Sequence, residues 1–364
     1  MNHKRKYAVM TAVSAILLML FAVIGQAAPA VTPASDGTDA VVTEQTADSV
    51  DVVTASVGEG QTDGFSVKKF VNQWLPYLVA GIANGGQYAL IAIGYTMVYG
   101  ILRLINFAHG DIFMCAGLMM VYFSASLNIF VAIPLVLILT VLLGFLVERC
   151  AYKPLRSAPR MSVMISAIGV SYLLQNLAFY ITSGLAKQYP VIPFLSEPIS
   201  LGSVQVKTVT VITPVLTVVL ILVLQLLIKK TKIGMAMRAV SFDFETSRLM
   251  GVKINSVISM TFIIGSFLAA VGSILFFSAY TTVTPTIGAM PGLKAFVAAV
   301  FGGIGSVPGA VIGAFIIGIV ENIIKGIANG EFSTFSDAVT FALLIIILVV
   351  KPTGLFGEKL KEKV

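Results

Sequence analysis

The chain has 364 residues, of which 57% are hydrophobic and only 11% charged, with a mean hydropathy of +0.95. A soluble domain is usually about 45–50% apolar and about a quarter charged, so this composition excludes an ordinary water-soluble fold and requires that most of the surface faces lipid. The formal net charge is +7, but the basic residues fall in short loops between apolar runs. That distribution indicates membrane topology rather than a nucleic-acid-binding surface.

The N-terminus has the three parts of a secretory targeting segment. Residues 4–6 are basic, residues 8–25 form an apolar stretch, and residues 26–30 offer the small side chains that a signal peptidase needs. The apolar stretch is long for a signal peptide and short for a membrane span, so two outcomes stay open. We expect residues 1–30 to be either a cleaved signal peptide or an uncleaved N-terminal anchor.

Residues 31–69 form a second, compositionally distinct segment. Between residues 31 and 66 the chain carries seven acidic residues and no Lys or Arg, and its apolar side chains show no helical period. Such a segment cannot bury enough apolar surface to offset the entropy lost on ordering. We expect an acidic disordered tail, and its lack of positive charge favours the extracytoplasmic side.

Nine apolar stretches follow, and all but one are long enough for a hydrocarbon core of roughly 30 Å. They are Trp74–Gly100, Phe107–Ala125, Ile129–Leu146, Ser162–Ser183, Thr208–Ile228, Val257–Ala279, Leu293–Gly303, Ala310–Ile327 and Phe335–Val350. The seventh stretch is too short to span alone. The sequence therefore predicts an all-α polytopic membrane protein. Residues 70–352 would form about nine transmembrane segments, one of them broken or short, after the N-terminal signal-like segment.

The positions of Lys and Arg predict the orientation of these segments. Basic residues gather at residues 149–160, at residues 229–253 and from residue 351 onward. All three regions fall on one side of the membrane if nine passes are counted, and the positive-inside rule makes this side cytoplasmic. We expect the mature N-terminus outside and a basic cytoplasmic tail over residues 353–364.

Closely spaced glycines near the short seventh stretch indicate either close helix packing or a break in the helix. Gly302, Gly305 and Gly309 belong to a run that also holds Gly303 and Pro308. Small residues let helices approach closely in lipid, which is one interpretation. The density of glycine around a proline favours the other, a helix break whose free backbone groups line a cavity.

Polar side chains inside or beside the predicted spans are candidates for a substrate path, because such groups usually face a bundle interior or a water-filled route. They are Asn84, Gln87, Tyr88, Tyr95, Asn106, His109, Asp111, Gln175 and Asn176. For the amide side chains, hydrogen bonding between helices is an equally good interpretation. His109 could also cap a helix or lie at the cytoplasmic surface.

No energy-converting motif accompanies the predicted spans. The chain lacks the G-x-x-x-x-G-K-[ST] sequence of a P-loop, and its spans show no row of Asp, Glu or Arg of the kind that carries protons or senses voltage. The two histidines, His3 and His109, offer no metal site of the usual His, Cys and carboxylate type. We expect no cofactor or metal, and any energy must come from a partner protein.

The longest loop on the basic side, residues 229–255, has features of a structured element. Asp243 can cap a short helix at its N-terminus, and Gly251 can end that helix in a left-handed conformation. Phe244 offers an apolar contact and Arg248 a charge. Two helical turns are unstable alone in water, so the element needs a surface to dock on: its own bundle or a partner. A merely solvated loop is the other alternative.

A series of motifs in order along the chain resembles LivH-type permease subunits of branched-chain amino-acid ABC transporters, from about Trp74 to the C-terminus. The motifs are Tyr88–Gly100, Ile105–Asp111, Glu148–Arg149, Tyr152–Arg156, Ile165–Gly169, Gln175–Asn176, Gly234–Ala239, Gly292–Phe296, Gly302–Ala310 and Lys351–Gly354. The N-terminal segment and acidic tail depart from the family, whose members typically begin near the first of these spans.

The resemblance implies an importer in the bacterial cytoplasmic (inner) membrane that works by alternating access. Its other parts would be a LivM-like second permease, two cytoplasmic ABC ATPases that use ATP, and an extracytoplasmic binding protein that selects Leu, Ile or Val. The family's coupling loop would correspond to the loop that holds Gly234, Arg238, Asp243, Phe244, Arg248 and Gly251. This subunit would be a permease and not an enzyme, and no nucleic acid would be involved.

Three alternatives stay open at this point. A permease for urea or short amides would use the same architecture, although the glycine run and Gly292–Phe296 look closer to the amino-acid branch. A passive channel would need a selectivity ring repeated by oligomer symmetry, for which the sequence offers no obvious candidate. A membrane-embedded enzyme would need clustered catalytic side chains at membrane depth.

Overall fold

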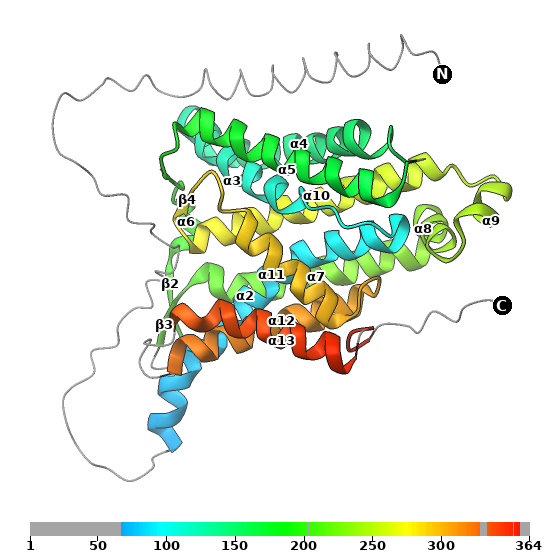
Figure 1. The fold of residues 1–364 in the computed structure, drawn as a ribbon. Helices are drawn as coiled ribbons and strands as arrows, with labels where there is room; N and C mark the ends of the chain where they lie inside the picture. The colour runs from blue at the N-terminus through cyan, green and yellow to red at the C-terminus, as the bar shows by residue number, and fades with distance from the viewer. Residues whose placement is uncertain (1–66, 157, 202–203, 328–332, 352, 357–364) are drawn as a thin grey trace.

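The computed structural model of the chain describes residues 67–156, 158–201, 204–327, 333–351 and 353–356. The predicted targeting segment, the acidic tail up to residue 66 and the basic tail from residue 357 lie outside these residues. Within them the fold is a bundle of long helices that run in broadly the same direction (Figure 1).

Each of the nine predicted apolar stretches corresponds to a helix. The helices are α2 (Val67–Leu102), α3 (His109–Ser126), α4 (Ile129–Val147), α5 (Arg160–Thr182), α7 (Thr208–Lys230), α10 (Ile254–Ala279), α11 (Ala289–Gly302), α12 (Val307–Gly326) and α13 (Ser336–Val350). The all-α prediction is confirmed. Helix α2, the first of the described residues, begins at Val67 and so before residue 70, the predicted start of the membrane domain.

Five helices of the described chain are long and apolar enough to cross a membrane by length and composition. They are α4 together with the π-helical turn η1 (Glu148–Tyr152), α5, α7, α10 and α12, and the apolar helices α11 and α13 are shorter. Helices α2 and α3 do not join the five, although both are long. They carry most of the polar candidates, and these side chains are buried among the other helices instead of facing lipid.

Short elements mark the two ends of the bundle (Figure 1). At one end β1 (Lys187–Gln188) pairs antiparallel with β4 (Thr282–Val283), and β2 (Pro198–Leu201) with β3 (Val204–Lys207), beside α6 (Pro193–Ser196). At the other end lie α8 (Lys232–Phe242) and α9 (Phe244–Leu249), in the predicted basic loop. A 3-10 turn, η3 (Ser333–Phe335), precedes α13.

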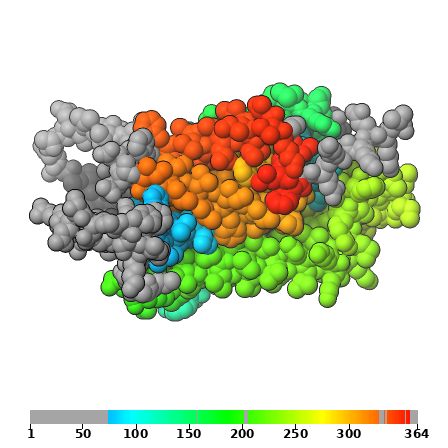
Figure 2. Space-filling model, turned by 90° about the horizontal axis from the view of Figure 1, so that it is seen from below, coloured from blue at the N-terminus to red at the C-terminus, as the bar shows by residue number. Residues whose placement is uncertain are grey.

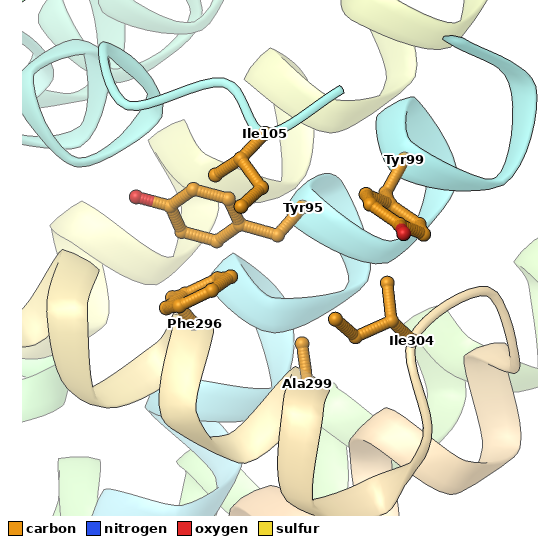
Figure 3. Close-up of a pocket in the computed structure, with 6 residues that line it drawn as sticks. All are labelled: Tyr95, Tyr99, Ile105, Phe296, Ala299 and Ile304. Carbon is orange, nitrogen blue, oxygen red and sulfur yellow. The ribbon is translucent and has the colours of Figure 1, made fainter. Parts of the chain in front are cut away.

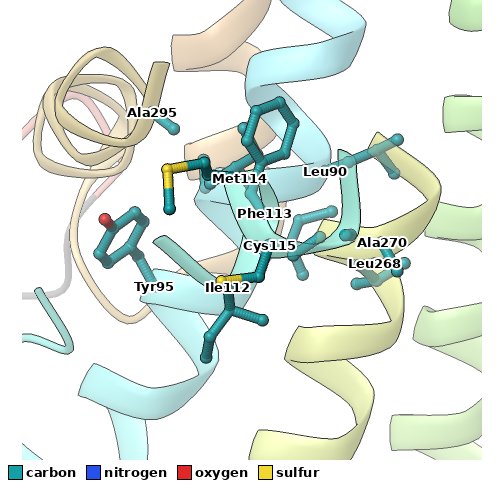
Figure 4. Packing of buried hydrophobic residues seen from close by; sticks show 14 of the residues in the cluster. Leu90, Tyr95, Ile112, Phe113, Met114, Cys115, Leu268, Ala270 and Ala295 are labelled. Carbon is teal, nitrogen blue, oxygen red and sulfur yellow. The ribbon is translucent and has the colours of Figure 1, made fainter. Parts of the chain in front are cut away.

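The core lies where α2, α3, α10 and α11 meet, and Figure 4 shows its apolar side chains interleaved. Phe113 of α3 packs against Phe276 and Phe277 of α10, with ring centroids 5.4 and 5.5 Å apart. Small residues bring α2 against α12: a methyl group on Gly318 would lie 2.5 Å from Gly85 Cα. In Figure 2 the orange and red surfaces of α12 and α13 lie beside the green surface of α7.

Candidate functional site

A cavity of about 340 Å³ lies between α2, α3, α5 and α11. Three of the polar candidates, Tyr95, Asp111 and Gln175, line it. Ile168 and Tyr172 of α5 also line it and are exposed, so the cavity opens at the surface of the chain. We call it the α3–α5 cavity.

One wall of the α3–α5 cavity is a polar cluster centred on Asp111. This carboxylate is only 2% exposed. Ser171 donates its hydroxyl hydrogen to Oδ2, and Gln175 donates from Nε2 to Oδ1 at 2.9 Å and to the Ser171 Oγ at 3.2 Å. Ser171 and Gln175 lie one turn apart on α5, so both reach across to the first turn of α3.

Two helices begin inside the bundle at this cavity. Helix α3 starts at His109 and α11 at Ala289, and a methyl group on Gly292 would lie 2.9 Å from Gly110 Cα. Non-helical chain within a membrane bundle is tolerated where it is buried in protein or lines a cavity. The sequence predicts such a break at Gly302–Gly309, whereas the sequence signal for this one is the glycine at residues 110, 288 and 292.

The predicted glycine break is present at the expected residues, but it does not line the α3–α5 cavity. Helix α11 ends at Gly302, and α12 begins at Val307. The turn lies at the α8–α9 end of the bundle, where the backbone N–H of Phe356 donates to the Gly302 carbonyl at 2.9 Å. A methyl group on Gly309 would lie 2.5 Å from that carbonyl oxygen, whereas a methyl group on Gly305 would have open space around it. Gly305 has φ +98° and serves the turn, not close packing.

A second, much smaller cavity of about 10 Å³ continues from the first towards the glycine turn (Figure 3). Tyr95 and Phe296 line both cavities, and their rings pack edge to face with centroids 6.1 Å apart. Ile304, within the glycine turn, lines the smaller one. The two aromatic rings thus form a shared wall between the α3–α5 cavity and the basic end of the molecule.

His109 is packed rather than cavity-lining. Its ring lies 5.1 Å from that of Tyr95 and is 2% exposed. A methyl group on Gly94 would lie 2.5 Å from His109 Cε1, so glycine at that position makes room for the imidazole. The residue lines neither of the two cavities, which favours its structural role over contact with substrate.

The polar candidates near the middle of α2 bind other helices. Asn84 exchanges hydrogen bonds with the hydroxyl of Tyr280, at 3.1 and 3.3 Å, at the end of α10. Tyr88 donates to Glu321 of α12 at 3.0 Å. Gln87 is buried, and its Oε1 finds no donor among the described residues. For Asn84 and Tyr88 the structure favours interhelical bonding.

An ionic cluster behind α2 was not predicted from the sequence. Glu321 accepts from Lys294 at 2.9 Å and from Lys325 at 3.0 Å, and Lys294 also pairs with Asp337 at 2.6 Å. Lys294 is buried in α11 and Glu321 in α12, so these charges lie within apolar helices. The cluster joins α11, α12 and α13 and is not a row of charges along a path.

The last two polar candidates lie apart from the cavity. Asn106 is buried in the segment that joins α2 to α3, and accepts from the Tyr152 hydroxyl at 2.8 Å. Asn176 is exposed on α5 and donates to the carbonyl of Tyr172, one turn back, at 2.7 Å. Gln175 and Asn176 are neighbours in sequence, yet only Gln175 faces the cavity.

A third buried acid lies at the basic end. Glu148 forms an ion pair with Arg156 and accepts from Ser259 at 2.8 Å. Arg156 also donates to Asn255, which ties the α4–α5 connection to α10. Burial lowers the pKa of Arg156, and the neighbouring Glu148 opposes this shift.

The predicted structure of the basic loop is confirmed. Asp243 caps α9, accepting from the backbone N–H of Thr246 at 3.0 Å, and Gly251 has φ +84° after the helix. Gly234 lies in the first turn of α8, where its N–H donates to Thr231 Oγ1 at 3.0 Å. Arg238 donates to the carbonyl of Lys229 at 3.4 Å.

Helices α8 and α9 expose apolar side chains at the end of the molecule. Leu249 and Met250 are at least 80% exposed, and Phe244 is exposed as well. Arg248 is exposed on α9 beside them. We call this surface the α8–α9 patch. Of the two docking alternatives, the bundle itself covers little of these apolar side chains.

Comparisons with known proteins agree on one family. Residues 77–348 match the model of a family described as "Branched-chain amino acid transport system / permease component". The chain is 38% identical over 307 residues to the high-affinity branched-chain amino acid transport system permease protein BraD of Pseudomonas aeruginosa, covering 81% of this chain and 99% of that protein. It is 38% identical over 310 residues to LivH of Escherichia coli K12, covering 80% and 98%. The ribose import permease RbsC of Haemophilus influenzae is 26% identical over 283 residues, covering 75% and 83%.

Proposed function

The chain belongs to the permease-component family of branched-chain amino acid transport systems, and from this premise we propose that it is the membrane subunit of an ATP-driven importer for Leu, Ile or Val. Relatives named for these substrates are 38% identical, whereas the ribose permease is 26% identical. This difference supports an amino-acid substrate over a sugar.

The observation that carries the proposal is the α3–α5 cavity. Its volume of about 340 Å³ falls within the range of small-molecule sites. Asp111, Ser171 and Gln175 supply one polar wall, and Phe107, Leu293 and Phe296 supply an apolar one. A branched-chain amino acid has one polar end and one apolar end, so its polar end can contact the polar wall and its side chain the apolar wall. Urea and short amides lack a group for the apolar wall.

Alternating access would use the wall between the two cavities. Tyr95 and Phe296 stand between the α3–α5 cavity and the glycine turn. Separating these rings would open a route to the basic end, and closing them would block it. Since Phe296 belongs to α11, a shift of this short helix against α2 is the simplest motion that opens the route.

The surfaces that stay uncovered suit the partners expected for such an importer. A second, LivM-like permease would cover the mouth of the α3–α5 cavity, so that the path runs between two subunits. Two cytoplasmic ABC ATPases would dock on the α8–α9 patch, and an extracytoplasmic amino-acid-binding protein on the strand end. The protein would lie in the bacterial cytoplasmic membrane with its mature N-terminus outside and its C-terminus inside, as the basic loops favour.

Reconstitution in proteoliposomes tests this function. The subunit is combined with its partner permease, ATPases and binding protein, and uptake of labelled leucine, urea and ribose is measured with and without ATP. We expect ATP-dependent leucine uptake that excess isoleucine or valine inhibits. Uptake of urea alone would support the amide-permease alternative, and leucine flux that is independent of ATP would support a passive channel.

A further inference from the structure

Three acidic side chains are buried in the part of the chain that the structure describes: Asp111, Glu148 and Glu321. Glu148 pairs with Arg156. Glu321 pairs with Lys294 and Lys325. A charge removed from water is tolerated when an opposite charge and hydrogen bonds replace the lost solvation, and two of the three acids follow this rule within the chain.

Asp111 differs from the other two. Its hydrogen-bond partners are the neutral groups of Ser171 and Gln175. Among the described residues no Lys or Arg forms an ion pair with it, and the neighbouring His109 ring is packed between α2 and α10. The positive ends of α3 and α11 stabilise the carboxylate, but a helix end carries only about half a charge. Among the described residues, nothing supplies the full positive charge that would balance this carboxylate.

The α3–α5 cavity is where a balancing cation can enter. Asp111 lines it, whereas neither Glu148 nor Glu321 lines either of the two cavities. The apolar side chains of Phe107, Leu293 and Phe296 share the same space. An occupant that satisfies both walls therefore combines a cationic group with an apolar one.

We propose that the Asp111 carboxylate binds the α-ammonium group of the transported amino acid in the α3–α5 cavity. This inference rests on the proposed function and names the group that the site recognises. Ser171 and Gln175 are positioning residues, since their donated hydrogen bonds fix the carboxylate towards the cavity. The substrate's side chain lies against Leu293 and Phe296, and its carboxylate lies near the first turn of α11, which holds no acidic residue.

The proposal predicts a recognition pattern that depends on the amine. Leucine and 3-methylbutylamine, which lacks only the carboxylate, should occupy the cavity. The acid 4-methylpentanoate, which lacks only the amine, should not. A merely apolar cavity would accept the acid in its neutral form and the amine alike.

Protection of an engineered cysteine measures this pattern. Leu293→Cys is introduced together with Cys115→Ala and Cys150→Ala into the full-length subunit, purified in detergent, and alkylation by N-ethylmaleimide is timed with each compound. Leu293 is exposed at the cavity wall, so the cysteine is open to the reagent. At saturating concentration we expect leucine and the amine to slow alkylation, because the bound molecule covers the cysteine, and the acid to have no effect.

Two carboxylate variants sharpen the test. Asp111→Asn, in the same background, should abolish protection by the amine, whereas Glu197→Gln, which removes a charge from an exposed loop, should leave it unchanged. Equal protection by the amine and the acid, or none by either, would overturn the proposal without any Asp111 variant. If the amine protects but the reconstituted transporter takes up no leucine, the proposed function fails and the cation site stands. If leucine is taken up without amine-dependent protection, only the cation site fails.

Discussion

The central and outer helices differ in burial and in the side chains they carry. Helix α10 lies in the centre, and 72% of its most apolar 18-residue stretch is buried inside the chain. In α5 and α7 the buried share of the corresponding stretch is 22%. The outer helices expose large apolar side chains such as Ile165, Leu173 and Leu222, which suit lipid. The central ones carry glycine, buried polar groups and ion pairs.

Hydropathy alone does not identify the central helices of this bundle. Helices α2 and α3 are not among the five most apolar helices, yet they lie at the centre and line the α3–α5 cavity. In lipid, close backbone packing and interhelical hydrogen bonds hold helices together. Hydropathy alone does not separate interior helices from lipid-facing ones here, because the buried α10 is more apolar than the exposed α5.

Glycine should matter at the centre and not at the periphery. Gly318→Leu places a side chain where Gly85 Cα lies 2.5 Å from its Cβ, so α12 must separate from α2. Gly169→Leu on α5 meets nothing within 4 Å and points into open space. We expect almost no folded protein for Gly318→Leu and a normal yield for Gly169→Leu, measured by size-exclusion chromatography of fluorescent fusions. Equal yields would contradict the close approach of α2 and α12.

Removing a buried charge should cost more than removing an exposed one. Glu321→Gln leaves Lys325 without its carboxylate and weakens the pairing of Lys294. Breaking a buried ion pair costs about 3–5 kcal/mol, whereas Glu197→Gln on an exposed loop should cost almost nothing. Thermal unfolding in detergent measures both. Lys294→Gln combined with Glu321→Gln should recover part of the loss, and a double variant less stable than either single one would contradict a direct pairing.

The glycine turn needs glycine for two different reasons, close packing at Gly309 and a positive φ at Gly305. Gly309→Leu collides with the Gly302 carbonyl oxygen, 2.5 Å from its Cβ, and should strongly destabilise the junction of α11 and α12. Gly305→Leu has open space around it but needs φ +98°, a conformation disfavoured for side-chain-bearing residues. We expect about 1–2 kcal/mol for that strain. Identical shifts in the unfolding temperature for the two variants would contradict this distinction.

Local features were predictable from the sequence, and pairings across the chain were not. The apolar stretches fixed the helices because hydrocarbon requires a minimum length, and the Asp243 cap needed only neighbouring residues. Asp111 and Ser171 lie 60 positions apart and Lys294 and Glu321 lie 27 apart, so their pairing depends on how the helices pack. Gln175 and Asn176 point in different directions because neighbouring residues on a helix are about 100° apart, but which of them faces the cavity depends on how α5 packs.

The α8–α9 patch should be the least important surface for stability and among the most important for transport. Its apolar side chains are exposed, so changing them removes few contacts within the bundle. Phe244→Asp combined with Arg248→Glu should leave membrane insertion and copurification of the partner permease unchanged. If ATPases dock there, loss of one apolar anchor and one charge should lower leucine uptake at least about tenfold, as for interface hot spots. Stimulation of ATP hydrolysis by loaded binding protein should fall with it.

Arg160→Glu, a charge reversal at the same end of the molecule but outside the patch, is the control. It should lower neither leucine uptake nor the stimulation of ATP hydrolysis. Normal ATPase stimulation in the double variant would show that the coupling surface lies elsewhere.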